Sequence, residues 1–198
     1  MNRLFIIVVL LTILSCCTTS TNHDKNAVPY QELFSKAKNG DVKSQYDLAN
    51  WYYAQGKKND YIEWLIKAAE QGLCEAQYDL AVSYDEGDGV ENNKALAVKW
   101  YLKATSNGDS DAPYNLAVMY DKGEYVKMDK KQAFYYYEMA AQRGHVKAMH
   151  NVGVSYYEGD GVTKDKYKAM EWFRKAAEHG EERSLHNYRA ILDEMKKD

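Results

Sequence analysis

GHVKAMHNVGVSYYEGDGVTKDKYKAMEWFRKAAEH, residues 144–179, is the stretch of sequence that decides the fold. The same unit recurs, with substitutions, in residues 108–143 and 72–107. Each unit opens on a glycine, and these glycines are Gly40, Gly72, Gly108, Gly144 and Gly180, separated by 32, 36, 36 and 36 residues. A fixed period near 36 residues with helical patterning predicts a solenoid of stacked helix pairs.

Each unit contains two stripes of small and apolar residues at helical spacing. In residues 144–179 the first stripe is Ala148, Val152, Gly153 and Tyr156, and the second is Ala169, Trp172, Phe173, Ala176 and Ala177. Between them lies EGDGV, residues 158–162, whose glycines accept the backbone angles that end a helix and turn the chain. We expect the small residues to allow close helix approach, and the large residues Trp100, Tyr136 and Trp172 to fill the space between neighbouring pairs.

The second copy shows the full motif, A-x-x-x-L-G/A-x-x-Y-x-x-G-x-G-V followed by K-A-x-x-W-Y/F-x-K-A-A-x-x-G. Its residues there are Ala76, Leu80, Ala81, Tyr84, Gly87, Gly89, Val90, Ala97, Trp100, Tyr101, Lys103, Ala104 and Gly108. This motif resembles the Sel-1-like repeat, a relative of the tetratricopeptide repeat. The resemblance implies an all-α fold, an α/α solenoid wound as a right-handed superhelix, and a role in binding proteins. It also implies that the first helix of each pair lines the concave surface.

The repeats divide the chain into successive segments. We expect a half-repeat helix at 29–39, a short first repeat at 40–71, repeats at 72–107, 108–143 and 144–179, and a capping helix at 180–198. The first copy lacks four residues around its turn, and the third has Tyr125 where the second glycine belongs. About ten helices are therefore expected.

Length and composition favour one elongated domain and argue against nucleic acid as a partner. The chain has 198 residues, 45% apolar residues and two prolines, and its net charge is −3 without a basic run. Tyrosine is over-represented, with 18 tyrosines against four phenylalanines.

The first residues read as an export signal with a lipid attachment site. Residues 4–14 are apolar except for Thr12, and such a helix is too short to cross a bilayer. Ile-Leu-Ser-Cys at residues 13–16 resembles a bacterial lipobox, which implies a signal peptide at 1–15 and lipidation of Cys16. Residues 16–28 are then a flexible tether. An ordinary signal peptide is the alternative. The resemblance and Cys17 favour the outer membrane of a bacterial envelope, facing the periplasm.

No constellation of residues typical of catalysis is found, so we expect no enzyme, no cofactor and no small-molecule substrate. The five histidines include no HExxH motif. His150 and His186 occupy equivalent positions in successive repeats, which is too wide a separation for one metal ion. The acidic stretch 85–93 lacks the spacing of a calcium loop. Cys74 is interpreted as a small half-buried residue.

Three rows of residues are candidates for a partner-binding groove on the first helices. The first row is Tyr46, Tyr78, Tyr114, His150 and His186; the second is Asn50, Val82, Val118 and Val154; the third is Tyr53, Asp85, Asp121 and Tyr157. Aromatic side chains edged by acids suit a protein-binding surface. The alternative is that the tyrosines fill the seam between repeats.

The sequence therefore predicts a non-catalytic, membrane-anchored module that binds a protein partner in its concave groove. Its role would be that of an envelope scaffold, an adaptor or a virulence-related factor. The resemblance leaves an alternative open, an immunity lipoprotein that neutralises a secreted toxin such as a phospholipase. A second alternative is a cell-wall or β-lactam hydrolase. Such activity has been attributed to cysteine-rich family members, whose paired cysteines this sequence lacks.

Overall fold

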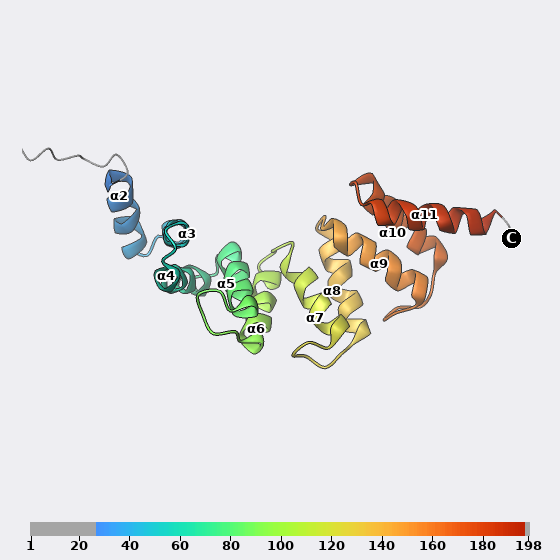
Figure 1. Cartoon of the computed structure of the whole chain (residues 1–198), viewed down its shortest axis with the longest axis horizontal. Coiled ribbons are helices and arrows are strands. Elements are labelled where there is room, and N and C mark those ends of the chain that lie inside the picture. Colours follow the sequence, from blue (N-terminus) through green and yellow to red (C-terminus); the bar gives the residue numbers. More distant parts are fainter. Residues whose placement is uncertain (1–26, 197–198) are drawn as a thin grey trace, which may run out of the picture.

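The chain is an α/α solenoid, as the sequence predicts. The computed structural model describes residues 27–196, so the expected signal peptide, Cys16 and most of the expected tether lie outside the described residues. Within this range the chain forms ten helices and no strands. They are α2 (Ala27–Lys38), α3 (Val42–Ala54), α4 (Lys58–Glu70), α5 (Cys74–Glu86), α6 (Lys94–Ser106), α7 (Ala112–Lys122), α8 (Lys130–Gln142), α9 (Val146–Glu158), α10 (Lys166–Glu178) and α11 (Glu182–Met195). Figure 1 shows them stacked along one long axis.

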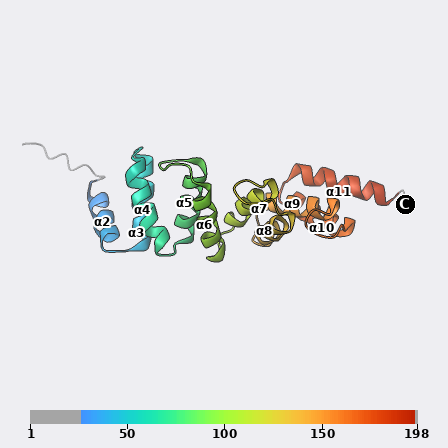
Figure 2. The same ribbon diagram turned by 90° about the horizontal axis from the view of Figure 1, so that it is seen from below.

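Successive helices form the expected pairs. The first helices of the repeats are α3, α5, α7 and α9, and each packs against the following second helix, α4, α6, α8 and α10. Figure 2 shows these pairs following one another along the solenoid. At the ends, α2 packs on α3 and α11 packs on α10, so each end carries one helix without a partner of its own pair. The helix α2 begins at Ala27, two residues before its expected start.

Local sequence signals explain where the helices begin and end. Asp129, Asn93 and Asp165 precede second helices, and each side chain accepts a hydrogen bond from a backbone N–H of the first turn. The first helices α5, α7 and α9 end at glycines with left-handed backbone angles. In the shortened first repeat, residues 55–57 alone connect α3 to α4.

Close approach of the two helices in a repeat depends on small residues at the centre of the first helix. Ala81, Ala117 and Gly153 occupy equivalent positions and are buried. A Cβ atom added to Gly153 would lie 2.7 Å from Cδ1 of Phe173, so the phenylalanine ring rests directly on this glycine. Helices α9 and α10 are held at this distance because no side chain separates them.

Two of the largest buried rings belong to Tyr101 and Phe173, the residues that directly follow the expected Trp100 and Trp172. Tyr101 and Phe173 are almost fully buried, whereas Tyr136 and Trp172 are half-buried. Trp100 is buried as expected, but its face is covered by a lysine, with Lys103 Nζ 3.9 Å from the ring centroid. A lysine also covers Trp64 and Trp172. These tryptophans therefore form a layer under lysines at the second-helix surface.

The turn of the fourth repeat rests on the preceding repeat, and this contact requires glycine. Gly161 has a φ angle of +71°, and a Cβ atom there would lie 2.0 Å from the carbonyl oxygen of Lys130, at the start of α8. Gly144 also has a positive φ angle, +94°, but a Cβ atom there meets no atom within 4 Å.

We predict that Gly161→Ala destabilises the fold more than Gly144→Ala. Both substitutions place alanine in the left-handed region, at a cost of about 1 kcal/mol. Gly161→Ala also forces the turn away from α8, which adds about 1–3 kcal/mol. Chemical denaturation followed by circular dichroism measures the two free energies of unfolding. Equal losses in the two variants would show that the turn does not rest on α8.

Candidate protein-binding face

Three hollows lie between neighbouring helices of the set α3, α5, α7, α9 and α11, and we call the surface that these helices present the first-helix face. A hollow of about 260 Å³ between α3 and α5 is lined by Asn50, Tyr53, Tyr61, Asp79, Val82, Ser83, Glu86 and Asp88. One of about 170 Å³ between α7 and α9 is lined by Asp121, Lys130, Ala133, Tyr137, Asn151, Val154, Ser155, Glu158 and Asp160. A third, of about 230 Å³ between α9 and α11, is lined by Val154, Tyr157, Glu158, Phe173, Asn187, Ala190 and Ile191.

The hollows recur because the same repeat positions line them. Val82 and Val154, members of the second predicted row, contribute apolar surface to the hollows. Glu86 and Glu158 end α5 and α9, and each lies at the rim together with an aspartate of the following turn. In the third repeat Lys122 takes the position of these glutamates. The rim is therefore acidic in the second and fourth repeats.

A row of lysines neutralises part of this acidic rim. The lysines are the first residues of the second helices, namely Lys58, Lys94, Lys130 and Lys166. Lys130 pairs with Asp121 at 2.8 Å and with Asp160 of the next repeat at 3.3 Å. Lys58 pairs in the same way with a turn aspartate of the next repeat, Asp88. Within residues 27–196, no lysine or arginine forms an ion pair with Glu86 or Glu158, so these two carboxylates are available to a partner.

The first predicted row lies at the seam between successive repeats. Tyr46 donates a hydrogen bond to Asp79 Oδ2 of the next repeat at 2.7 Å, and Asn115 Nδ2 donates to the Tyr78 hydroxyl at 3.5 Å. The Tyr114 ring stacks on His145, with centroids 4.2 Å apart. These side chains are half-buried. Seam contacts, the alternative considered for the sequence, therefore occupy this row.

The two histidines of the first row have different environments. His150 is buried, and its Nδ1 lies 2.7 Å from Ser184 Oγ and 3.3 Å from Glu181 Oε2. His186 occupies the equivalent position on α11 and is exposed. The structure therefore brings the first four members of the row into the seam and leaves the fifth on the surface.

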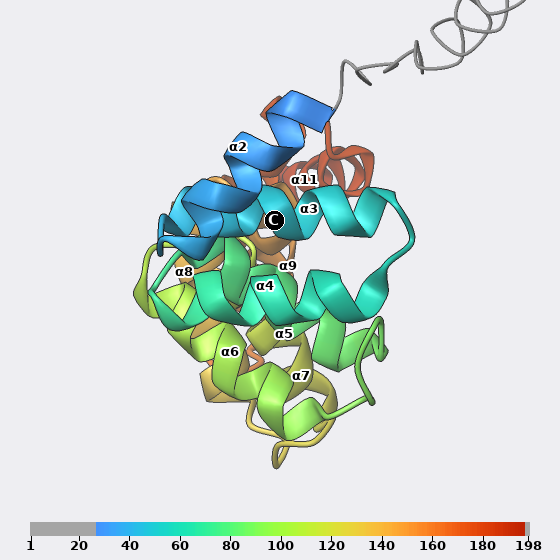
Figure 3. The same ribbon diagram turned by 90° about the vertical axis from the view of Figure 1, so that its left-hand side faces the viewer.

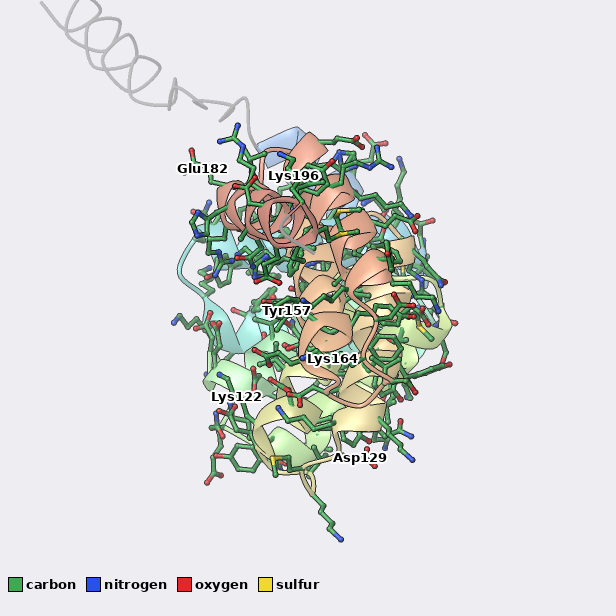
Figure 4. All side chains as sticks on the ribbon, turned by 90° about the vertical axis from the view of Figure 1, so that its right-hand side faces the viewer. Lys122, Asp129, Tyr157, Lys164, Glu182 and Lys196 are labelled. Atoms are coloured by element: carbon green, nitrogen blue, oxygen red, sulfur yellow. The ribbon has the colours of Figure 1, made fainter. Side chains whose placement is uncertain are left out.

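Three of the four side chains in the third predicted row form ion pairs or hydrogen bonds within the chain. Asp85 pairs with Lys94, and Asp121 pairs with Lys130. Tyr157 donates a hydrogen bond to Glu194 of α11 at 3.3 Å, and Figure 4 shows Tyr157 between the C-terminal helices and the lower turns. Tyr53 is 51% exposed and lines the first hollow. The role of these residues in partner binding stays a prediction.

The sequence did not single out the rim acids. Glu86 and Asp88 belong to the acidic stretch 85–93, and Glu158 and Asp160 belong to the turn sequence 158–162. The signal that finds them is the comparison of successive repeats: Glu86, Lys122 and Glu158 share one position, so charge alternates along the face.

Ser184, His150 and Glu181 lie together, but the arrangement is structural. Ser184 is 0% exposed, so a substrate has no access to its hydroxyl group. Glu181 precedes α11 and accepts a hydrogen bond from the Ser184 backbone N–H, as a helix cap does. Burial opposes ionisation of Glu181, but hydrogen bonds from Arg183 and Ser184 lower its pKa to about 2. Residues 27–196 contain no cluster that suits a metal ion, and none of their helices has the length and apolar character of a membrane span.

Two histidines that lie at contacts between repeats, His145 and His150, predict that the stability of the fold depends on pH. Burial lowers the pKa of His150 and of His145 below the ordinary value of 6.5. His145 Nδ1 also accepts a hydrogen bond from Ala148 N–H, which protonation of that nitrogen would remove. The unfolded chain binds protons at these two histidines more readily than the folded chain does. The stabilising contribution of the neutral histidines is therefore complete above pH 6.5, and it is lost as the pH falls through their lowered pKa values.

We therefore predict a lower melting temperature at pH 5.5 than at pH 7.5, with a smaller difference in the His145→Gln/His150→Gln variant. The control is His186→Gln, because His186 is exposed on α11. Thermal unfolding followed by circular dichroism measures the difference. If the double variant keeps the full pH dependence of the wild type, the seam histidines are not its source.

Comparison with known proteins places these repeats. The family model described as "Sel1 repeat" matches four segments of the chain, residues 42–73, 74–109, 110–145 and 146–181. A protective antigen of uropathogenic Escherichia coli with an SLR fold is 40% identical, with a TM-score of 0.74 over 78% of this chain. The chain spans 34% of that antigen's length. No curated protein matches the chain.

Two further solved structures share the fold. A Sel1 repeat protein from Oxalobacter formigenes is 28% identical, with a TM-score of 0.70 over 83% of this chain and 67% of that one. Cysteine-rich protein B of Helicobacter pylori is 24% identical, with a TM-score of 0.53 over 65% of this chain and 95% of that one, a likeness of fold alone. The four matched repeats cover most of the sequence, and the chain belongs to the Sel1 repeat family.

Proposed function

We propose that this chain is a non-catalytic interaction module that binds a protein partner on its first-helix face. Proteins with Sel1 repeats generally act as protein–protein interaction modules. The observation that carries the proposal is the series of hollows with valines in their linings and acids at their rim. Hollows that combine some apolar surface with charged and polar side chains suit the binding of a protein.

The acidic side chains at the rim indicate the charge of the partner surface that would bind there. Glu86 and Glu158 are exposed and separated by two repeats, with Lys122 between them. A partner that presents basic side chains to the second and fourth repeats complements this pattern. Valine and tyrosine side chains in the hollows would then contact the apolar stems of those residues.

The proposed location is the bacterial envelope, with a lipid on Cys16 as the anchor. Its support is the Ile-Leu-Ser-Cys sequence at residues 13–16 after an apolar stretch. Several acyl chains on one cysteine give stable membrane attachment without a spanning helix. The outer membrane, facing the periplasm, is the proposed site. The Escherichia coli relative, described as a protective antigen, is compatible with a role in the envelope or in virulence.

Scaffolding and toxin immunity predict different partners for the same face. An envelope scaffold would hold a resident envelope protein, whereas an immunity lipoprotein would hold a secreted toxin with a basic surface. We propose the scaffold or adaptor role and keep immunity as the alternative. The identity of the partner separates the two.

We predict that Glu86→Lys/Glu158→Lys reduces partner capture about tenfold or more. Lysine is compatible with this position, because Lys122 occupies it in α7. The measurement is crosslinking of the full chain in cells, followed by purification and mass spectrometry of the captured proteins. The matched control is Glu70→Lys/Glu171→Lys, which makes the same charge change at exposed positions of the second helices α4 and α10.

A partner retained by the wild type and the control but lost from the rim variant supports binding at the first-helix face. If all three chains capture the same proteins in the same amounts, the first-helix face is not the binding surface.

Replacement of Cys16 tests the anchor separately. We predict that Cys16→Ser removes incorporation of a palmitate analogue and releases the chain from the membrane fraction, because the acyl chains supply the attachment. Metabolic labelling and membrane fractionation measure both effects, with Cys17→Ser as the control. Labelling that persists in Cys16→Ser and is lost in Cys17→Ser would move the anchor to Cys17.

A further inference from the structure

The third repeat differs from its neighbours at three exposed positions. Tyr125, Met128 and Tyr135 are 69%, 59% and 53% exposed. The equivalent residues are Gly89, Asn92 and Lys99 in the second repeat and Gly161, Lys164 and Glu171 in the fourth. Small or polar residues therefore suffice for the fold at these positions. The third repeat carries large apolar side chains there, on the turn and on the second helix α8.

Tyr125 is held in a backbone conformation that disfavours its side chain. Its φ angle is 62°, and among residues 27–196 it is the one non-glycine residue with a positive φ angle. An aromatic residue in the left-handed region costs stability. The ring contacts Lys94, whose Nζ lies 5.4 Å from the ring centroid, but it is mainly exposed, so burial offsets little of this cost. A strained residue whose side chain faces solvent points to a functional requirement.

A hollow of about 750 Å³ opens beside this turn. Its lining includes Tyr120, Val126 and Met128, together with Gly161 of the next turn. The Tyr120 ring stacks on Tyr136 with centroids 5.7 Å apart. Tyr136 in turn contacts the exposed Tyr135 edge to face, at 5.1 Å. An apolar surface therefore continues from the hollow to α8. We call the hollow, together with Tyr125, Met128 and Tyr135, the repeat-three edge.

The charges around the hollow are mainly positive. Lys127 and Lys131 line it and are exposed, and no carboxylate within residues 27–196 forms an ion pair with either. Lys130 also lines it and is held by Asp121 and Asp160. The carboxylate of Asp129 accepts hydrogen bonds from the first backbone N–H groups of α8, so it serves as a helix cap.

We propose that the repeat-three edge is a second docking surface, which takes an acidic protein segment that inserts an apolar side chain into the hollow. The two free lysines complement carboxylates of the segment, and Tyr125 and Met128 contact its apolar residue. The acidic rim of the first-helix face is suited to the opposite charge, so the two surfaces select different partners.

The repeat-three edge lies on the side of the molecule away from α2 and α11. Figure 3 shows the connection between α7 and α8 at the edge of the molecule opposite α2. In Figure 4, Asp129 of this connection lies at the far end from Glu182 and Lys196.

The test is a selection from a phage-displayed library of random peptides on the full-length chain in nonionic detergent. The variant Tyr125→Gly/Met128→Asn/Tyr135→Lys installs the residues of the second repeat. It adds one positive charge to the edge, which would favour acidic peptides, so any loss of binding reports the apolar contact. We expect wild-type selection to enrich peptides with an aromatic or aliphatic residue beside Asp or Glu, and the variant to bind them about tenfold more weakly.

Two further variants separate this proposal from the first-helix face and from a folding defect. Lys127→Glu/Lys131→Glu should also lose the peptides, whereas Glu86→Lys/Glu158→Lys should keep them. The triple variant should melt no lower than the wild type, because Tyr125→Gly removes the unfavourable backbone conformation.

Four results would overturn the proposal. The first is enrichment of the same peptides by the wild type and the triple variant, and the second is enrichment of basic peptides. The third is self-association of the wild type, but not of the triple variant, in sedimentation velocity, which would make the edge an interface between copies of this chain. Loss of the peptides in Glu86→Lys/Glu158→Lys would place their binding on the first-helix face.

Discussion

The contact between a buried ring of the second helix and a small residue of the first is the constraint on which the solenoid depends. In the fourth repeat Phe173 lies so close to Gly153 that a Cβ atom would overlap the ring. Because the helices approach this closely, each pair is thin and can stack on the next through the remaining faces. The turn at Gly161 then meets the carbonyl oxygen of Lys130, which fixes how one repeat sits on another.

This stacking decides which polar side chains are available for binding. Tyr46 and His150 lie where one first helix meets the next, and they bond with Asp79 and Ser184 across the seam. Lys58 and Lys130, which begin second helices, form ion pairs with turn carboxylates of the next repeat. Glu86 and Glu158 form none of these ion pairs and line the hollows. Partner binding is therefore proposed at side chains that take no part in the contacts between repeats.

The sequence predicted the architecture well and the binding surface less well. The period of 36 residues and the stripes of small residues were enough for the helix pairs, because stacked repeats leave few alternatives. Periodicity does not reveal toward which neighbour a side chain leans, so the sequence leaves open whether the row of Tyr46 and Tyr78 faces a groove or the seam, where the structure shows its contacts. Likewise, the backbone strain at Tyr125 and the hollow beside it depend on atomic positions that no spacing specifies.

The most direct test of this account is oxidative footprinting of the full chain, with mass spectrometry of each labelled tyrosine. The account predicts slow labelling of the seam residues Tyr46, Tyr78 and Tyr114, and fast labelling of the exposed residues Tyr53 and Tyr125. Labelling of the three seam tyrosines as fast as Tyr53 would contradict it. The row would then be open to a partner, and the repeats would be held together by other contacts.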